Sequence, residues 1–264
     1  MVNYYFLLSI SNPSPDFCGM QDFLLEIACY SPHSAIIAEK AGAHRIELCD
    51  NPAEGGTTPS FGMLKLTREM ISIPVFPIIR PRGGHFVYSS EEVKIMKSDI
   101  QLCKHSGFEG VVIGLLNEMG EVAYEDTARL TEWAWPLDVT FHRAFDRTIE
   151  PFEAMETIIR AGCTRILTSG QVPDVNNGTA LVAKLIESAA HRIIIMPGSG
   201  VRANGIAALA AKTGASEFHS SASFWENERF YSPLSMEETI QQNKVNPAEI
   251  ENMSANLKAY FQAS

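Results

Sequence analysis

Short apolar runs alternate with amphipathic stretches from residue 23 to about residue 220. The apolar runs are centred near residues 25, 46, 77, 111, 140, 166, 194 and 218, and a helical pattern fills each interval between them. Runs of consecutive apolar residues are typical of parallel strands that are covered on both faces. The regular alternation of strand and helix therefore predicts an α/β fold with a parallel sheet.

Eight strand–helix units in about 200 residues favour a single-domain (β/α)8 TIM barrel over an open doubly wound sheet. An open dinucleotide-binding sheet would carry a GxGxxG motif after its first strand, where this chain reads Cys29-Tyr30-Ser31-Pro32. We predict a loop-like N-terminal extension over residues 1–22 and the barrel over residues 23–222. Residues 223–264 are expected to pack on the barrel as a loop with two helical stretches, near 234–243 and 247–261.

The predicted barrel helices begin at residues that favour helix starts and end close to glycines. Ser31 and Pro32 suit an N-cap and a first helical position, and Gly42 follows the end of the same helix. Helices are expected over 32–41, 61–70, 90–105, 124–133, 151–161, 179–190 and 203–212.

The chain is acidic and rich in apolar residues. Hydrophobic residues make up 45% of it, and the formal net charge is -10. Nucleic acids and anionic membranes both require clustered cations, so neither is an expected partner. The apolar runs are too short for a transmembrane helix, and the apolar start lacks the basic residues and cleavage site of a signal peptide. Five cysteines without a CxxC pair favour reduced thiols and a cytoplasmic location.

Charged and imidazole side chains gather where the predicted strands end, and sites in TIM barrels lie at those carboxyl ends. Glutamates occur inside two apolar runs, and a carboxylate there is costly unless it is paired. Two interpretations remain open, namely an ion-pair layer that closes the barrel and a ligand or catalytic pocket. The candidate catalytic residues are Glu26, Glu47, Arg80, His142 and His219.

A glycine-rich segment follows the seventh predicted strand and precedes a helix. It resembles the backbone cradle that holds phosphate in other barrels, and hydroxyl groups after the eighth strand could add donors. A tight turn is the alternative interpretation. The candidate anion-binding residues are Arg80, Gly198, Ser199, Gly200 and Ser220.

Two cysteines follow neighbouring predicted strands, and together they form a candidate metal site. Thiolates favour copper(I), whereas isolated buried cysteines more often act as small hydrophobic residues. Cys29 has the opposite side-chain parity to Glu26, whereas Cys49 shares the parity of Glu47. Both thiols point into the mouth only if the chain has left regular strand geometry at Cys29.

Seven segments of the chain, spread over residues 23–224, resemble the CutC family of copper homeostasis proteins. They occur in the family's order, and their length makes a chance match implausible. The segments are Leu25-Glu-Ile-Ala-Cys-Tyr-Ser31, Ala41-Gly-Ala-His-Arg-Ile-Glu-Leu-Cys49, Glu54-Gly-Gly-Thr-Thr-Pro-Ser60, Ile79-Arg-Pro-Arg-Gly-Gly84, Thr140-Phe-His-Arg-Ala-Phe-Asp146, Arg165-Ile-Leu-Thr-Ser-Gly-Gln171 and Glu217-Phe-His-Ser220.

The resemblance implies a (β/α)8 barrel, a cytoplasmic protein and self-association, as a homodimer or homotetramer. It also implies a part in copper homeostasis, with copper(I) bound by cysteines near the barrel mouth. Family members commonly carry a cysteine two residues after the glutamate of the first strand, where this chain has Ala28. Cys49 matches the family's second cysteine, so the thiolate pair is half present.

Two functions follow from these observations. The first is copper homeostasis, with a copper ion or a small ligand bound at the mouth of the barrel. The second is an enzyme acting on a small anionic or phosphorylated metabolite, with glutamate and histidine as acid–base groups and Arg80 as part of an anion clamp. The first depends on Cys49, whereas the second depends on Glu47, Arg80 and His142.

Overall fold

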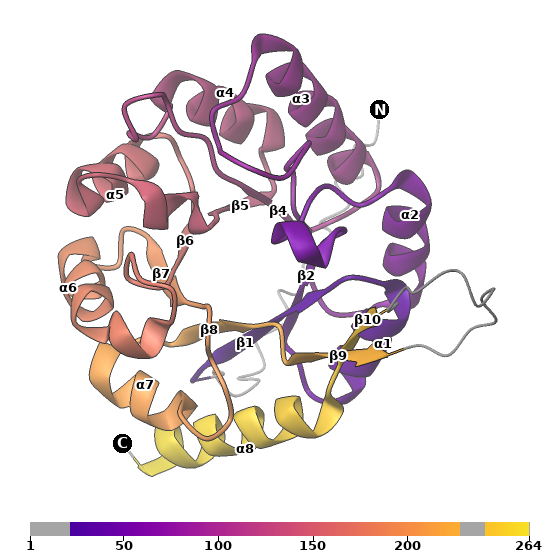
Figure 1. Cartoon of the computed structure of the whole chain (residues 1–264), viewed down its shortest axis with the longest axis vertical. Helices are drawn as coiled ribbons and strands as arrows, with labels where there is room; N and C mark the ends of the chain where they lie inside the picture. Colours follow the sequence, from indigo (N-terminus) through magenta and orange to yellow (C-terminus); the bar gives the residue numbers. More distant parts are fainter. Residues whose placement is uncertain (1–21, 228–240, 264) are drawn as a thin grey trace, which may run out of the picture.

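The computed structural model, described over residues 22–227 and 241–263, contains a ring of parallel strands surrounded by helices (Figure 1). This is the predicted (β/α)8 barrel. Its strands are β1 (Leu24–Cys29), β2 (Arg45–Leu48), β3 (Val75–Pro77), β4 (Gly110–Ile113), β5 (Asp138–Phe141), β6 (Arg165–Thr168), β7 (Ile194–Pro197) and β8 (Glu217–Ser220).

The ring consists of two four-stranded parallel sheets that meet along their edges. One has the order β3-β2-β1-β8 and the other β4-β5-β6-β7. A bridge between Ile78 and Val112 joins β3 to β4, and β7 lies beside β8. Since all eight strands run in the same direction, their carboxyl ends and the loops that follow them meet at one end of the barrel.

The helices begin and end close to the predicted positions. Serine side chains cap three of them by accepting a backbone N–H, and Ser89 and Glu92 form a reciprocal capping box. The seventh helix begins at residue 206 instead of the predicted 203. The barrel helices are α1 (Pro32–Lys40), α2 (Phe61–Met70), α3 (Ser90–His105), α4 (Tyr124–Ala134), α5 (Pro151–Arg160), α6 (Thr179–Ala189) and α7 (Ile206–Thr213).

Successive side chains of the strands alternate between the helix layer and the barrel interior. Leu25 and Ile27 are fully buried within the large apolar core that includes the helices. Glu26 lies between them in sequence and points to the opposite side, as the period of two requires. The barrel interior therefore holds a different set of side chains, many of them charged.

The C-terminal segment differs from the prediction in one element. Residues 241–243 were expected to end a helix, but they belong to β10 (Gln241–Val245), which pairs antiparallel with β9 (Ser223–Asn227). Residues 228–240 lie outside the described part of the chain, as do residues 1–21 of the predicted extension. α8 (Pro247–Ala263) packs against α1 and α7, as expected. None of the helices described combines the length and apolarity needed to cross a bilayer.

Candidate functional site

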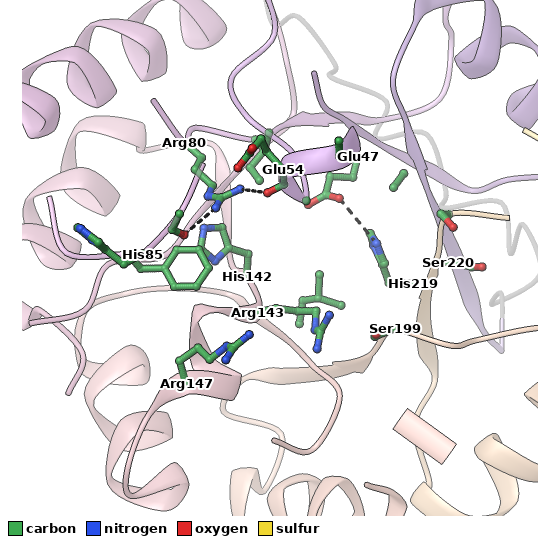
Figure 2. Close-up of a pocket in the computed structure, with 18 of the residues that line it drawn as sticks. Glu47, Glu54, Arg80, His85, His142, Arg143, Arg147, Ser199, His219 and Ser220 are labelled. Carbon is green, nitrogen blue, oxygen red and sulfur yellow. Dashed lines mark hydrogen bonds and ion pairs between the residues drawn. The ribbon is translucent and has the colours of Figure 1, made fainter. Parts of the chain in front are cut away.

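A cavity of about 810 Å³ opens at the carboxyl ends of the barrel strands (Figure 2). Its walls come from strands and loops around the whole barrel. Arg80 follows β3, His142 follows β5 and His219 lies in β8. Its volume is in the range of small-molecule sites.

The cavity is more basic than the protein around it. Among the described residues, four arginines and two glutamates line the cavity, whereas the whole chain has a net charge of -10. A local excess of arginines attracts anions even in an acidic protein. The arginines are Arg80, Arg143, Arg147 and Arg202, and the glutamates are Glu47 and Glu54.

Glu26 lies beneath the cavity in a network of ion pairs. Its carboxylate is bonded to Arg45, and its Oε1 lies 2.7 Å from Nδ1 of His219. Burial alone would raise the pKa of Glu26, but the charges of Arg45 and His219 outweigh burial and hold that pKa well below its usual value. Glu26 is 1% exposed and does not line the cavity, so its carboxylate serves as an ion-pair partner of Arg45 and His219.

The same network continues across the barrel. Nη2 of Arg45 lies 2.8 Å from the Glu217 carboxylate, and Nε of Arg165 lies 2.6 Å from it. Both guanidinium groups lie over the ring of Phe76, 4.9 and 5.7 Å from its centroid. We call Glu26, Arg45, Arg165 and Glu217 the interior network. Its two cations balance its two carboxylates, as buried charges require.

Glu47 lies in the cavity wall without an arginine partner. Its only ion pair among the described residues joins its Oε2 to Nε2 of His219, at 3.7 Å. Burial is the main cause that raises the pKa of Glu47, and the charge of Glu26 adds to it against the opposing effect of His219. For His219, burial lowers the pKa, but the two carboxylates outweigh it and raise the pKa. Burial therefore favours the neutral form of Glu47, and the neighbouring carboxyl groups favour the protonated form of His219.

Arg80 connects two loops of the cavity wall. Its Nη1 donates hydrogen bonds of 2.6 Å to the carbonyl oxygens of Glu54 and Gly56, and its Nη2 donates one of 2.9 Å to Gly84. The guanidinium also lies over the ring of Phe86, at 5.1 Å. Arg80 therefore holds the loops after β2 and β3 together and gives this wall a positive charge.

His142 is a neutral histidine with a fixed tautomer. Its Nδ1 accepts a hydrogen bond of 3.0 Å from the backbone N–H of Ala144, so the ring proton is on Nε2. That Nε2 is buried and has no hydrogen-bond partner among the described residues. Burial, with a contribution from the charge of Arg80, lowers the pKa of His142 to about 3.

The ring of His142 is held in place from two sides. The ring of Phe86 lies against one side, with 5.0 Å between the ring centroids. On the other side, a Cβ atom at Gly114 would lie 2.2 Å from Cε1 of His142. Only glycine leaves room for the ring at this point, so the orientation of the imidazole is determined by packing.

Three of the cavity's arginines are partly or fully exposed. Arg143 forms an ion pair of 2.8 Å with Asp146 and donates a hydrogen bond of 3.0 Å to the hydroxyl of Ser169. The side chains of Arg147 and Arg202 are exposed and make no hydrogen bond or ion pair within the described part of the chain. Their guanidinium groups are therefore available to a ligand.

The predicted glycine-rich cradle differs from a helix-terminal anion site. Helix α7 begins only at residue 206, so the segment 198–200 does not lie at its N-terminus. The hydroxyl of Ser199 donates to the carbonyl of Pro173, and a Cβ at Gly200 would lie 2.6 Å from the Asp174 carboxyl group. Gly198 packs against Leu167 and His219. Ser199 and Gly200 do line the cavity. The negative charge of the Asp174 carboxylate beside Gly200 nevertheless disfavours an anion at this segment.

Ser220 lines the cavity, but its hydroxyl is occupied. It donates to the carbonyl oxygen of Val201 at 2.9 Å and accepts from the N–H of Ala222 at 3.1 Å. Its contacts hold two loops of the mouth together.

Of the two candidate metal-binding cysteines, Cys29 ends β1 and Cys49 follows β2, and they lie in different layers. Cys29 is packed in the core between barrel and helices, and Cys49 lies inside the barrel beside Phe76 and Ile78. Burial is the main cause that raises the pKa of both thiols, and neither thiol lines the cavity. In residues 22–227 and 241–263, no three His, Cys, Asp or Glu side chains gather as a metal site would require. These donors do not fit a thiolate copper site at the mouth.

The five candidate catalytic residues fall into two groups. His219 contacts both Glu26 and Glu47, whereas Arg80 and His142 lie together on another part of the wall. Sequence reasoning missed the cations that pair with Glu26 and Glu217. Arg45 has the same strand parity as Glu47, so the alternation along β2 could have identified it.

The sequence and the fold are similar to those of known proteins. The model of the CutC family matches residues 23–224. A family protein CutC from Chromobacterium violaceum is 50% identical over 201 residues, covering 76% of this chain and 81% of its own length. The copper homeostasis protein cutC homolog of Homo sapiens is 45% identical over 210 residues, covering 80% and 77%. A CutC crystal structure from Streptococcus agalactiae has a TM-score of 0.73 and 32% identity, covering 75% of this chain and 98% of that one. The chain belongs to the CutC family.

Proposed function

We propose that the cavity binds a small anionic metabolite and that Glu47 exchanges a proton with it. One observation carries the proposal: a buried carboxyl group without an arginine partner faces a cavity with four arginines in its wall. Arginine binds carboxylates and phosphates through its fork of donors. A carboxyl group inside such a cavity is suited to general acid–base catalysis.

Each charged group of the cavity has a distinct part in this proposal. Arg147 and Arg202 bind the anionic group of the ligand, because their donors have no partner within the described residues. Arg80 adds positive charge, but its Nη donors are occupied by backbone carbonyls. His219 lies next to Glu47 and receives or supplies the proton.

The test is a calorimetric titration of the full chain with inorganic phosphate, phosphorylated trioses and small carboxylates. Replacing both exposed arginines, Arg147→Gln with Arg202→Gln, is expected to weaken binding about 10- to 100-fold, the value of one or two charged hydrogen bonds. Arg192→Gln is the matched control, because Arg192 pairs with Glu156 outside the cavity. Equal binding by the double variant and the wild type would contradict the proposal.

A second candidate function is direct binding of copper(I) by Cys29 and Cys49. The name of the human relative, copper homeostasis protein cutC homolog, favours a part in copper homeostasis. The Cys49 backbone N–H donates a hydrogen bond of 2.9 Å to the Cys29 carbonyl oxygen, and Cys29 is among the groups that raise the pKa of Cys49. The two backbones are therefore adjacent, although both thiols are buried in different layers and Ala28 stands where the family's first cysteine is expected.

Copper(I) titration of the reduced protein against a competing chelator tests this second function. We expect weak binding that Cys49→Ala abolishes and that Ala28→Cys strengthens, because residue 28 faces the cavity and residue 29 does not. Cys163→Ala is the control, since Cys163 is buried elsewhere in the core. Tight binding that survives Cys49→Ala contradicts a site at this pair.

We also propose that the chain acts in the cytoplasm as a homodimer or homotetramer. The free, buried cysteines of the described residues suit a reducing compartment. Exposed apolar side chains on α2, at Phe61, Leu66 and Met70, suit contact with a second copy. Light scattering of the purified protein should give two or four times the chain mass of 29.1 kDa. A monomer mass contradicts the assembly, and a tagged chain found outside the cytoplasm contradicts the location.

A further inference from the structure

We propose that the ligand of this cavity carries a carbonyl group and that His142 binds the carbonyl oxygen through its Nε2–H. This inference rests on the proposed function, because it specifies which anions the cavity accepts. They are anionic carbonyl compounds, such as keto acids or the phosphates of small aldehydes and ketones.

The Nε2–H of His142 is a hydrogen-bond donor without an acceptor among the described residues. The N–H of Ala144 occupies Nδ1, so the neutral ring donates only through Nε2. His142 is 5% exposed and lines the cavity, yet Nε2 has no partner among the described residues. Buried polar groups normally have a hydrogen-bond partner. An oxygen atom of the ligand would supply the missing one.

The surroundings of the imidazole favour a carbonyl oxygen over other oxygen atoms. The groups near the ring include the cation Arg80, the apolar ring of Phe86 and the N–H of Ala144, and none of these three accepts a hydrogen bond. A carbonyl oxygen only accepts hydrogen bonds, so the Nε2–H satisfies it, whereas a hydroxyl group also has a proton that needs an acceptor. A carboxylate or phosphate finds stronger partners in the exposed arginines Arg147 and Arg202.

This arrangement suits removal of a proton from the carbon next to the carbonyl group. The Glu47 carboxylate takes that proton, and the electron pair of the C–H bond forms a C=C bond. The π electrons of the carbonyl move to its oxygen, where the Nε2–H of His142 stabilises the negative charge. Return of the proton to another atom of the ligand completes an isomerisation. Figure 2 shows the side chains of Glu47 and His142 around the same cavity.

The first experiment measures the tautomer of His142 without any ligand. Long-range nitrogen–proton spectra of the uniformly labelled full chain give the protonation of each ring nitrogen, and His142→Gln assigns the signal. We expect a proton on Nε2 alone from pH 7 down to pH 5. A proton on Nδ1, or on both nitrogens, at pH 7 overturns the inference and leaves the proposed function unaffected.

The second experiment compares probes that differ only in the carbonyl group. Dihydroxyacetone phosphate is paired with glycerol 3-phosphate, and pyruvate with lactate, so that phosphate and carboxylate are tested separately. We expect the wild type to bind the carbonyl member of one pair about tenfold more tightly, because the alcohol leaves a polar group unpaired. In His142→Phe this preference should disappear, whereas His142→Gln, which keeps an N–H donor, should retain part of it.

The outcomes separate this inference from the function on which it rests. If both members of a pair bind equally well to the wild type, the carbonyl inference is wrong and anion binding stands. If neither pair binds, and inorganic phosphate does not bind either, the proposed function fails together with the inference. If His142→Phe unfolds, the tautomer measurement and the wild-type preference still decide the question.

Discussion

The cavity has two walls that place a histidine in opposite surroundings. On the wall of β1, β2 and β8, His219 lies between two carboxyl groups, which raise its pKa. On the wall after β3 and β5, His142 lies beside Arg80 and an aromatic ring, and burial with the nearby cation lowers its pKa to about 3. The neighbouring groups therefore decide the state of each histidine: carboxyl groups favour the protonated form of His219, whereas burial and Arg80 keep His142 neutral.

The largest expected effect comes from breaking the ion-paired wall. Arg45→Met leaves Glu26 and Glu217 buried with too little positive charge. We expect a loss of about 3–5 kcal/mol in the free energy of unfolding, as for other broken buried pairs. Denaturant unfolding followed by circular dichroism measures it. The control is Arg192→Met, which removes an exposed ion pair to Glu156 and should cost less than about 1 kcal/mol.

A smaller effect is expected from the opposite wall. Arg80→Met removes three hydrogen bonds to backbone carbonyls, and we expect a loss of about 3 kcal/mol at roughly 1 kcal/mol each. Arg80→Lys keeps the charge but not the fork of donors, so it should recover only part of the stability. Full recovery by lysine would show that the charge, and not the loop connection, is what this wall requires.

The two histidines should give stability a pH dependence of opposite sign. His142 is neutral in the folded state and takes up a proton near pH 6.5 when unfolded, so its contribution is lost as pH falls from 6.5 towards 3. This loss amounts to about 1.4 kcal/mol per pH unit. Between pH 7 and pH 5, the free energy of unfolding of His142→Gln should therefore fall by about 2 kcal/mol less than that of the wild type.

For His219 the sign is reversed. Its pKa is raised on folding, so its contribution is complete below the unfolded pKa and is lost as pH rises through the folded pKa. His219→Gln should therefore change the stability profile on the alkaline side of pH 6.5. Parallel profiles for the wild type and both variants would show that the walls do not differ electrostatically.

The smallest effect on stability is expected at Glu47. Glu47→Gln removes a buried carboxyl group that has no arginine partner, and the free energy of unfolding should stay within about 1 kcal/mol or rise. The matched variant Glu26→Gln removes a carboxylate bonded to Arg45 and should be clearly destabilising. Equal losses in the two variants would indicate a structural role for both glutamates.

The sequence predicted the barrel well because its strands and helices have strong local patterns. The α3 bounds, Ser90–His105, follow from a serine cap and acidic residues in the first turn. The prediction of a helix that ends near residue 243 was wrong for residues 241–243, because these residues pair with β9 as a strand.

The candidate site was predictable only in part. The apolar runs placed Glu47 and His219 at the carboxyl ends of their strands, but a loop arginine such as Arg147 has no periodic pattern that shows where its side chain points. The role of Arg80 also depends on carbonyl groups of the distant loop residues Glu54 and Gly56, which the sequence cannot position. The tautomer of His142 depends on a single backbone N–H.

The interior network also determines how molecules travel to and from the cavity. The guanidinium groups of Arg45 and Arg165 and the ring of Phe76 beside them are buried in the barrel interior. A ligand therefore enters, and its product leaves, through the same opening at the carboxyl ends of the strands. A reaction with two substrates would need both of them within about 810 Å³ at once, or one product to depart before the next substrate arrives.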